Sequence, residues 1–274
     1  MSSLNIDTAT AHTAKAIAVF DIDGVIRDVS GSYRRAVADT VEHFTAAAYR
    51  PTAEDIDQLK SEGCWNNDWQ ASQELIYRYF ETQGQTRSQL ALSYDELVDF
   101  FQRRYRGADL ENPDQWDGYI SQEAILAEQV YFAQLSHDQV AWGFFSGATQ
   151  GSASYILERR IGLRQPVLVA MEDAPGKPDP TGLLKTVTLI EQQGILPGLP
   201  VVYAGDTVAD MQTVQAAQAQ KGDRRWLAVG ILPPHVQHAA DYAATYRQKL
   251  QAAGAAIVLE NITQLTARLI HQLI

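Results

Sequence analysis

The chain carries the stretch Val19-Phe20-Asp21-Ile22-Asp23-Gly24-Val25, an apolar run that ends in two carboxylates one residue apart and a glycine. Residues 16–20 are all apolar, which predicts the buried central strand of a parallel sheet. Because open α/β sheets bind ligands at the carboxyl ends of their strands, Asp21 and Asp23 should lie at that edge. Side chains alternate along a strand, so both carboxylates start on one face, and Gly24 allows a sharp turn after them. This arrangement suits one Mg²⁺ ion and one phosphate.

A calcium loop of the helix–loop–helix kind is the competing interpretation of two aspartates followed by glycine. Such a loop needs further oxygen ligands and a glutamate late in the loop. Here Val25-Ile26-Arg27 follows instead. The residues therefore favour a site at the end of a strand.

A second apolar run, residues 140–145, is followed by Ser146, Gly147 and Ala148 ahead of a predicted helix. A hydroxyl and backbone N–H groups at the start of a helix can bind a phosphate, which makes these three residues candidates for phosphate binding. The alternative is that Ser146 or Thr149 only caps the helix.

A third apolar run, residues 166–171, leads into a loop in which Lys177 stands between Gly176 and Pro178. We expect this loop to be stiff, with Pro180 opening the next helix. Lys177 could neutralise a phosphoryl oxygen there. The alternative is an ordinary solvated lysine.

A fourth apolar run, residues 200–204, ends in Gly205 and Asp206, with Asp210 four residues further on. Two carboxylates at this spacing can face one ion where a strand turns into a helix. The alternative is an aspartate at the helix N-cap and a surface aspartate one turn later.

In combination the four motifs resemble those of the haloacid dehalogenase-like hydrolase superfamily over roughly residues 15–231. The matching residues are, in chain order, Asp21 and Asp23, then Ser146, then Lys177, and finally Gly205-Asp206 with Asp210. The resemblance implies an α/β fold, a doubly wound parallel-sheet Rossmann-like core, and phosphoryl-transfer chemistry that uses Mg²⁺.

The residue types indicate a mechanism for that chemistry. Asp21 would attack phosphorus and form an aspartyl-phosphate, while Asp23 would protonate the leaving alkoxide and then deprotonate the attacking water. Lys177 and Ser146 would hold the transferring phosphoryl group. The expected metal ligands are Asp21, the backbone carbonyl of Asp23 by family resemblance, Asp206, and Asp210 directly or through water.

About 120 residues separate the first motif from the second. The insertion resembles that of family members with an all-helical cap domain. We expect a flexible tail at 1–14, a catalytic core at 15–31 and 137–274, and a helical cap domain at 32–136. Its expected helices are 32–48, 52–62, 68–82, 93–104 and 121–135.

The remaining core elements follow from the same patterns. Two further strands are expected at 226–231 and 256–259. The predicted helices of the core are 152–160, 181–192, 211–220, 235–252 and a terminal one that begins after Asn261.

Substrate selection should reside in the expected cap, since the core handles only the phosphate. Asn66 and Asn67 could bind sugar or carboxylate oxygens while Trp69 packs on a ring or carbon chain. The alternative is that Asn67 or Asp68 caps a helix and the tryptophans are core. Arg27 could meet a substrate carboxylate or pair with Asp28.

Within the family the pattern resembles phosphatases of the phosphoglycolate-phosphatase and β-phosphoglucomutase type. This favours a Mg²⁺-dependent phosphatase for a small phosphorylated metabolite. A phosphomutase that uses the same intermediate is the alternative, and a non-catalytic regulator that binds a phospholigand is disfavoured by the intact motifs. A phosphonatase would need a cap lysine for a Schiff base, and the expected cap has only Lys60.

Composition limits the partners and the compartment. The 274 residues carry a formal charge of −11, which disfavours nucleic acids and anionic membranes as partners. A single cysteine, Cys64, excludes an internal disulfide and fits a reducing compartment. No apolar run approaches the roughly 20 residues of a membrane span, and residues 1–14 lack signal-peptide features. We therefore expect a cytoplasmic protein.

Overall fold

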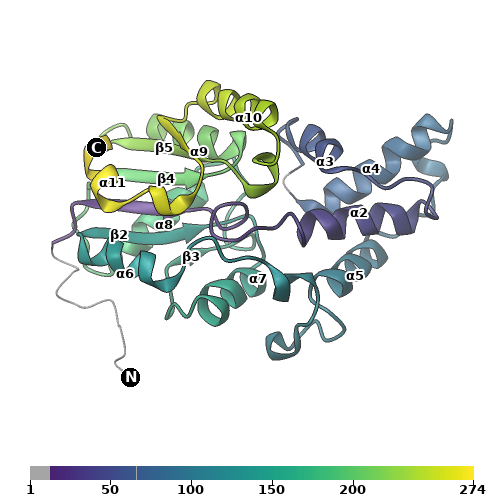
Figure 1. Ribbon diagram of the computed structural model, residues 1–274, viewed down its shortest axis with the longest axis horizontal. Helices are drawn as coiled ribbons and strands as arrows, with labels where there is room; N and C mark the ends of the chain where they lie inside the picture. Colours follow the sequence, from purple (N-terminus) through teal and green to yellow (C-terminus); the bar gives the residue numbers. More distant parts are fainter. Residues whose placement is uncertain (1–12, 66) are drawn as a thin grey trace. The chain divides into compact units, whose positions relative to one another are not determined.

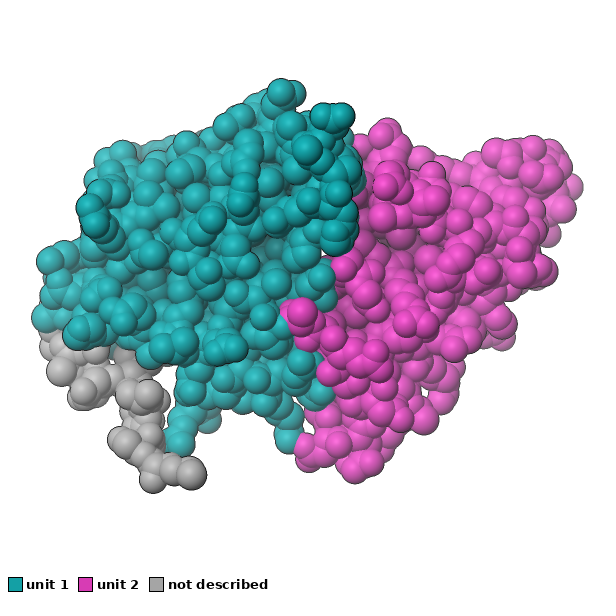
Figure 2. Space-filling model, viewed as in Figure 1, with its two compact units in different colours: residues 1–28, 125–274 teal, residues 29–124 magenta. Residues whose placement is uncertain are grey.

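The computed structural model describes residues 13–65 and 67–274 of the chain. The chain divides into two compact units, shown in different colours in Figure 2. We call residues 13–28 and 125–274 the core unit, and residues 29–124 the insert unit.

A parallel sheet organises the core unit (Figure 1). In the described part of the chain it has six strands in the order β3-β2-β1-β4-β5-β6. The strands are β1 (Ala16–Phe20), β2 (Val140–Phe145), β3 (Leu168–Val169), β4 (Val201–Gly205), β5 (Trp226–Ile231) and β6 (Ile257–Leu259). The predicted α/β class and the central position of β1 are thus confirmed.

Helices cover both faces of this sheet, as the doubly wound prediction requires. Alternation along β1 sends Ile17 and Val19 into a hydrophobic cluster with residues of three of these helices, whereas Phe20 packs edge-on against Phe132 on the other face. The core helices are α6 (Gln129–His137), α7 (Gln150–Ser154), the π-helix Tyr155–Arg160, α8 (Thr181–Gln192), α9 (Val208–Gln220), α10 (Ala240–Ala252) and α11 (Ala267–Leu273).

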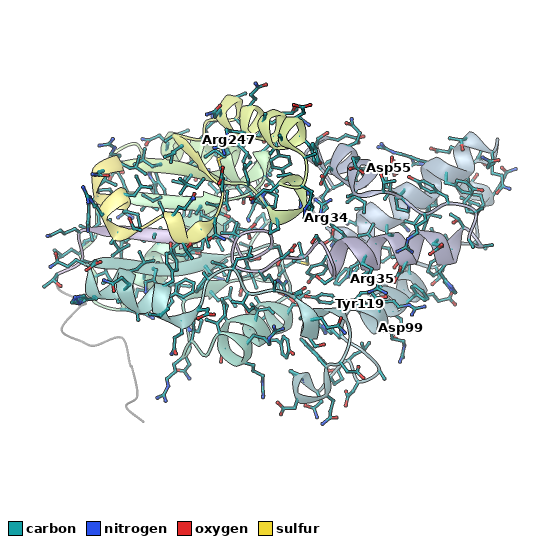
Figure 3. The ribbon with its side chains drawn as sticks, in the orientation of Figure 1. Arg34, Arg35, Asp55, Asp99, Tyr119 and Arg247 are labelled. Atoms are coloured by element: carbon teal, nitrogen blue, oxygen red, sulfur yellow. The ribbon has the colours of Figure 1, made fainter. Side chains whose placement is uncertain are left out.

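The insert unit is helical, as predicted. Its α-helices are α2 (Tyr33–Phe44), α3 (Ala53–Lys60), α4 (Asp68–Thr82) and α5 (Tyr94–Tyr105), with 3₁₀ turns at Arg87–Gln89, Pro113–Gln115 and Tyr119–Gln122. Buried apolar residues such as Val37 and Leu75 pack these helices together. Arg35 lies over the ring of Tyr119, 4.3 Å from the ring centroid, and links α2 to the last turn (Figure 3).

The expected helix at 121–135 is wrong in its first half, and this moves a domain boundary; its second half is helical and belongs to α6. Ile125 forms a β-bridge with Arg27, and the Leu126 N–H donates to the Ile26 carbonyl at 2.8 Å. The backbone here is therefore extended, and α6 begins only at Gln129. The insert unit accordingly spans 29–124 instead of the expected 32–136.

Three smaller expectations also differ from the structure. The predicted helix at 235–252 is interrupted: a 3₁₀ turn at Pro234–Val236 precedes α10, which begins only at Ala240. The strand expected at 166–171 is only two residues long. Ala14 is 7% exposed and belongs to the core cluster, so the expected tail at 1–14 is wrong at its end; residues 1–12 lie outside the described residues. None of the helices in the described part has the length and apolarity needed to cross a membrane.

Candidate active site

The carboxyl ends of neighbouring strands bring the motif residues of the core unit together. β1 pairs with β2 on one side and with β4 on the other. Asp21 directly follows β1, and its N–H donates to the Ala204 carbonyl of β4 at 2.9 Å. Ser146 follows β2, and its N–H donates to the Val169 carbonyl of β3 at 3.0 Å. The hydrogen bonds of the sheet thereby set the positions of both backbones.

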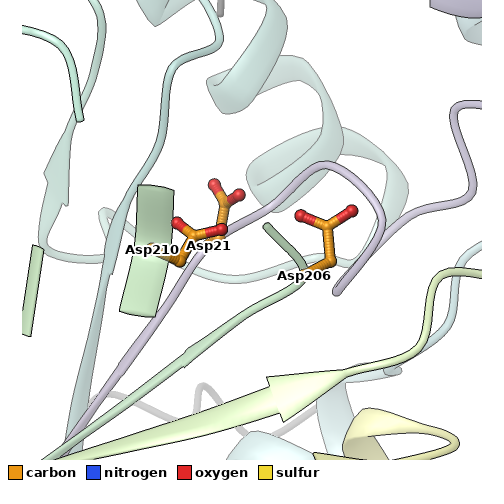
Figure 4. A group of neighbouring side chains, drawn as sticks. All are labelled: Asp21, Asp206 and Asp210. Carbon is orange, nitrogen blue, oxygen red and sulfur yellow. The ribbon is translucent and has the colours of Figure 1, made fainter. Parts of the chain in front are cut away.

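Three of the expected metal ligands form one acidic cluster, made of Asp21, Asp206 and Asp210 (Figure 4). One carboxylate oxygen of each lies within 4.8 Å of the others. All three side chains are buried, and Asp210 is fully inaccessible. Hard oxygen ligands grouped in this way fit Mg²⁺, which prefers carboxylate oxygen and water. The residue set therefore suits the metal that the sequence predicts.

Lys177 reaches this acidic cluster from the loop between β3 and α8. Its Nζ lies 2.9 Å from Asp21 Oδ1 and 2.6 Å from Asp210 Oδ1. Burial acts to lower the pKa of Lys177, but the charges of Asp21 and Asp210 outweigh burial and raise this pKa above its usual 10.5. The lysine is therefore a fixed positive charge beside the carboxylates.

Asp210 is held by donors on both of its oxygens. Oδ1 accepts from the Tyr203 hydroxyl at 2.9 Å, and Oδ2 accepts from the Thr207 N–H at 2.9 Å and the Thr207 hydroxyl at 2.6 Å. The Thr207 contacts form a capping box at the start of α9. Burial acts to raise the pKa of Asp210, but Lys177 and Thr207 lower it below 3.8. These contacts favour the ionised form of Asp210, which pairs with Lys177.

Tyr203 is a site residue that the sequence reasoning missed. It lies in the middle of β4, is fully buried, and its ring centroid is 5.5 Å from Lys177 Nζ. Burial raises its pKa well above 10.0, which keeps the hydroxyl a neutral donor. The signal in the sequence is a single tyrosine within an otherwise aliphatic run, because a buried hydroxyl needs a partner.

Asp21 combines burial with a charged neighbourhood. Burial raises the pKa of this carboxyl from 3.8 to about 7; Lys177 opposes the rise and the charge of Asp210 adds to it. Its Oδ1 also accepts the Ile22 N–H at 2.8 Å. A divalent cation in the acidic cluster would favour the ionised form, which is the form needed for nucleophilic attack.

Asp23 and Arg27 are paired. Arg27 Nε lies 2.6 Å from Asp23 Oδ1. The Arg27 side chain is fully buried, whereas the Asp23 side chain is 28% exposed. A contact between Arg27 and a substrate carboxylate is therefore not supported, because the Arg27 side chain has no exposed surface.

Gly24 makes the turn that follows Asp23, with φ +75° as expected for a left-handed residue. A Cβ at this position would lie 2.2 Å from Asp206 Oδ2 and 2.8 Å from Asp206 Cγ. Because Gly24 has no Cβ, the turn can lie directly against the Asp206 side chain of the fourth motif.

In the second motif, one of the backbone N–H groups expected to bind phosphate donates to a side chain of the same loop instead. Ser146 is 1% exposed, and its Oγ accepts the Ala148 N–H at 3.2 Å. Thr149 is the N-cap of α7, accepting from Ser152 N at 3.4 Å. The capping alternative thus holds for Thr149. Gly147 is exposed, and a Cβ placed on it would meet no atom within 4 Å, which leaves its backbone accessible.

The residues expected to select the substrate lie in the insert unit. Asn67 is the N-cap of α4, where its Oδ1 accepts from Trp69 N at 2.9 Å and Gln70 N at 3.2 Å. That capping role accounts for Asn67. Trp69 is half-buried, and Asn66 lies outside the described residues. Lys60 pairs with Asp68 at 2.7 Å, which gives no support to a Schiff-base lysine.

A cavity of about 420 Å³ opens in the core unit beside Gly24. Its wall combines apolar side chains such as Leu126 and Leu232 with polar ones such as Gln237, His238 and Asn261. A volume of this order accommodates a small metabolite.

A family model described as haloacid dehalogenase-like hydrolase matches residues 15–218. A curated imidazoleglycerol-phosphate dehydratase from Phytophthora nicotianae is 27% identical over 249 residues, which are 88% of this chain. The chain spans only about half, 49%, of the length of that relative.

Solved structures share the fold. A phosphonoacetaldehyde hydrolase-like protein from Oleispira antarctica matches with a TM-score of 0.66 and 16% identity, covering 99% of this chain and 96% of that one. A putative β-phosphoglucomutase from Thermotoga maritima matches with a TM-score of 0.58 and 16% identity, covering 95% and 100%. At these identities the matches establish the architecture alone.

Proposed function

Because the chain belongs to the haloacid dehalogenase-like hydrolase family, we propose that it is a Mg²⁺-dependent phosphatase. In this proposal it hydrolyses the phosphate monoester of a small metabolite through an aspartyl-phosphate on Asp21. The observation that carries the proposal is the position of Asp21, buried within the acidic cluster and 2.9 Å from Lys177. A nucleophilic carboxylate, a fixed cation and further carboxylates for a metal are what phosphoryl transfer requires.

The residues that would hold Mg²⁺ are Asp21 and Asp206, with the Asp23 backbone carbonyl as a further ligand. When bound, the ion would neutralise charge on the phosphoryl oxygens. Asp210 is already engaged by Thr207, Tyr203 and Lys177. We therefore propose that Asp210 contacts the metal through water.

The chain's own residues would carry out two displacements at phosphorus. Asp21 attacks, a new bond forms between its oxygen and phosphorus, and the bond to the leaving oxygen breaks. Asp23 gives its proton to that leaving oxygen, which departs as an alcohol. Asp23 then takes a proton from water, whose oxygen attacks phosphorus and releases phosphate and the Asp21 carboxylate. Lys177 and Ser146 would hold the phosphoryl oxygens throughout.

Small phosphate monoesters are the proposed substrate class. The volume of the cavity beside Gly24 in the core unit supports this class. Polyol phosphates are candidates, since a protein that is 27% identical to this chain is an imidazoleglycerol-phosphate dehydratase. We place the protein in the cytoplasm, because a lone, exposed and unpaired Cys64 suits a reducing compartment.

A phosphomutase is the second candidate, since the same phosphorylated Asp21 could pass its phosphoryl group to a sugar hydroxyl. Stoichiometry separates the two functions. A phosphatase releases one phosphate for each substrate consumed. A mutase converts a sugar phosphate into a positional isomer without matching free phosphate.

The experiment that tests the proposal is a screen of the purified protein against a panel of metabolite phosphates. The panel should contain sugar phosphates, polyol phosphates and imidazole-bearing phosphate esters, each with Mg²⁺ and with EDTA. We expect Mg²⁺-dependent phosphate release from at least one small monoester, and its loss in Asp21→Asn. Phosphate release by Asp21→Asn at the rate of the unchanged protein would refute the proposal.

A further inference from the structure

Arg27 is a charged side chain in an apolar part of the core unit. It is 0% exposed, and its neighbours along the chain, Ile22, Val25 and Ile26, are also 0% exposed. Removing a guanidinium from water is unfavourable unless a partner compensates, and an apolar side chain at such a place often gives equal or greater stability. The position of Arg27 therefore calls for an explanation other than packing.

One partner of Arg27 is the carboxylate that the proposed mechanism uses as its acid. The contact joins Arg27 Nε to Asp23 Oδ1 at 2.6 Å, and it uses one oxygen only. In the part of the chain that the structure describes, Asp23 Oδ2 accepts no hydrogen bond. Arg27 thus holds one oxygen of Asp23, and the 28% exposure of the Asp23 side chain leaves part of the carboxylate accessible.

The backbone makes this contact rigid. The Arg27 N–H donates to the Ile22 carbonyl at 3.1 Å, and the Gly24 N–H donates to the Arg27 carbonyl at 2.9 Å. Arg27 forms β-bridges with Asp23 and, on its other side, with Ile125. The hydrogen bonds of the turn at residues 22–27, and the bridge from Arg27 to Ile125, therefore fix the backbone positions of Asp23 and Arg27 relative to one another.

We propose that Arg27 is a positioning residue for the proton transfer by Asp23: it holds Oδ1 so that Oδ2 faces the oxygen of the leaving group. This inference rests on the proposed function. Arg27 itself contacts neither the phosphate nor the leaving group. A short charge-assisted hydrogen bond of this kind restricts the rotation of a carboxylate that would otherwise turn freely, and small errors in orientation are costly for proton transfer.

The test compares two esters that differ in their need for an acid. Glycerol 2-phosphate leaves as an alkoxide and needs a proton, whereas 4-nitrophenyl phosphate leaves as a stable phenolate. The quantity to measure is kcat/KM, because it reports the steps up to the departure of the leaving group and excludes the later attack by water. The variants are Asp23→Asn, Arg27→Gln, Arg27→Lys and the double variant, with Arg224→Gln as control.

Arg27→Gln should lower kcat/KM for glycerol 2-phosphate by about 10-fold or more, and for 4-nitrophenyl phosphate by less than about 3-fold, which is the selectivity of a lost acid. Arg27→Lys keeps a positive charge, so its kcat/KM for glycerol 2-phosphate should lie between the values of Arg27→Gln and of the unchanged protein. If Arg27→Gln does not fold, Arg27→Lys provides the test. Adding Arg27→Gln to Asp23→Asn should cause no further loss on glycerol 2-phosphate, because both changes remove one function. Arg224 pairs with Glu191 on a distant part of the core unit, so its variant should leave both activities unchanged.

Equal losses on both esters in both Arg27 variants, or losses that multiply in the double variant, would show a merely structural role and overturn the inference. The proposed function fails separately. If the unchanged protein hydrolyses neither ester, or if Asp23→Asn does not discriminate between them, the acid role of Asp23 is refuted and the inference about Arg27 falls with it.

Discussion

Gly24→Ala should disable the site by moving Asp206, with a smaller effect on stability. The new Cβ would lie 2.2 Å from Asp206 Oδ2. Asp206 or the turn must then shift by about 1 Å to reach an ordinary contact, and a misplacement of about 1 Å can cost roughly 100-fold in rate. The φ of +75° adds backbone strain of about 1–2 kcal/mol for a residue with a Cβ.

Gly198→Ala separates these two effects. Gly198 has φ +85°, and a Cβ on it would meet nothing within 4 Å. Both variants should therefore lower the midpoint of thermal unfolding by a similar few degrees, at about 2–4 °C for each kcal/mol. Only Gly24→Ala should also lose activity.

The assay is the hydrolysis of 4-nitrophenyl phosphate at increasing Mg²⁺ concentration, together with thermal unfolding of each variant. We expect Gly24→Ala to lose about 100-fold in kcat/KM and to need more Mg²⁺. Gly198→Ala should match the unchanged protein in both respects. Full activity in Gly24→Ala, or an equal loss in Gly198→Ala, would refute the argument that contact with Asp206 is what requires glycine.

Three further predictions follow from the acidic cluster. EDTA should abolish hydrolysis and Mg²⁺ should restore it, whereas Ca²⁺ should inhibit because its larger, flexible coordination misplaces Asp21 relative to phosphorus; full activity in EDTA would exclude the metal. Asp206→Ala should raise the Mg²⁺ concentration for half-maximal activity more than Asp210→Ala, since Asp210 is occupied by protein donors; the reverse order would exchange their roles. Without metal, the pKa of Asp21 is about 7 in the folded protein, against the usual 3.8 of an aspartate. Between these two values the folded state binds more protons than the unfolded state, so the free energy of unfolding should fall as pH rises through that range. Asp21→Asn should abolish this contribution, and an unchanged pH dependence in that variant would assign it to another group.

The strands and the four motifs could be predicted from the sequence because their signals are local. An apolar run such as residues 16–20 defines a buried strand by itself, and the polar residues that follow it must lie at the ligand-binding edge. Each motif follows a strand of one parallel sheet, which is why Asp21, Lys177, Asp206 and Asp210 lie together.

The errors concern contacts that no local pattern encodes. Residues 121–135 contain enough apolar side chains for a helix, but Ile125 is extended because it pairs with Arg27, nearly 100 residues earlier. The contact of Arg27 with Asp23 depends on the same turn. The role of Tyr203 required knowledge of which side chain its buried hydroxyl would reach.

The nucleophilic role of Asp21 is tested most directly by trapping the phosphorylated protein. Asp23→Asn should still react with 4-nitrophenyl phosphate, whose leaving group needs little acid, but should be slow to activate the water that releases phosphate. We expect mass spectrometry of acid-quenched, digested Asp23→Asn protein to locate one phosphoryl group on Asp21, and to find none when Asp21→Asn is added. Phosphate release without any phosphorylated peptide, or a phosphoryl group on another residue, would contradict the account.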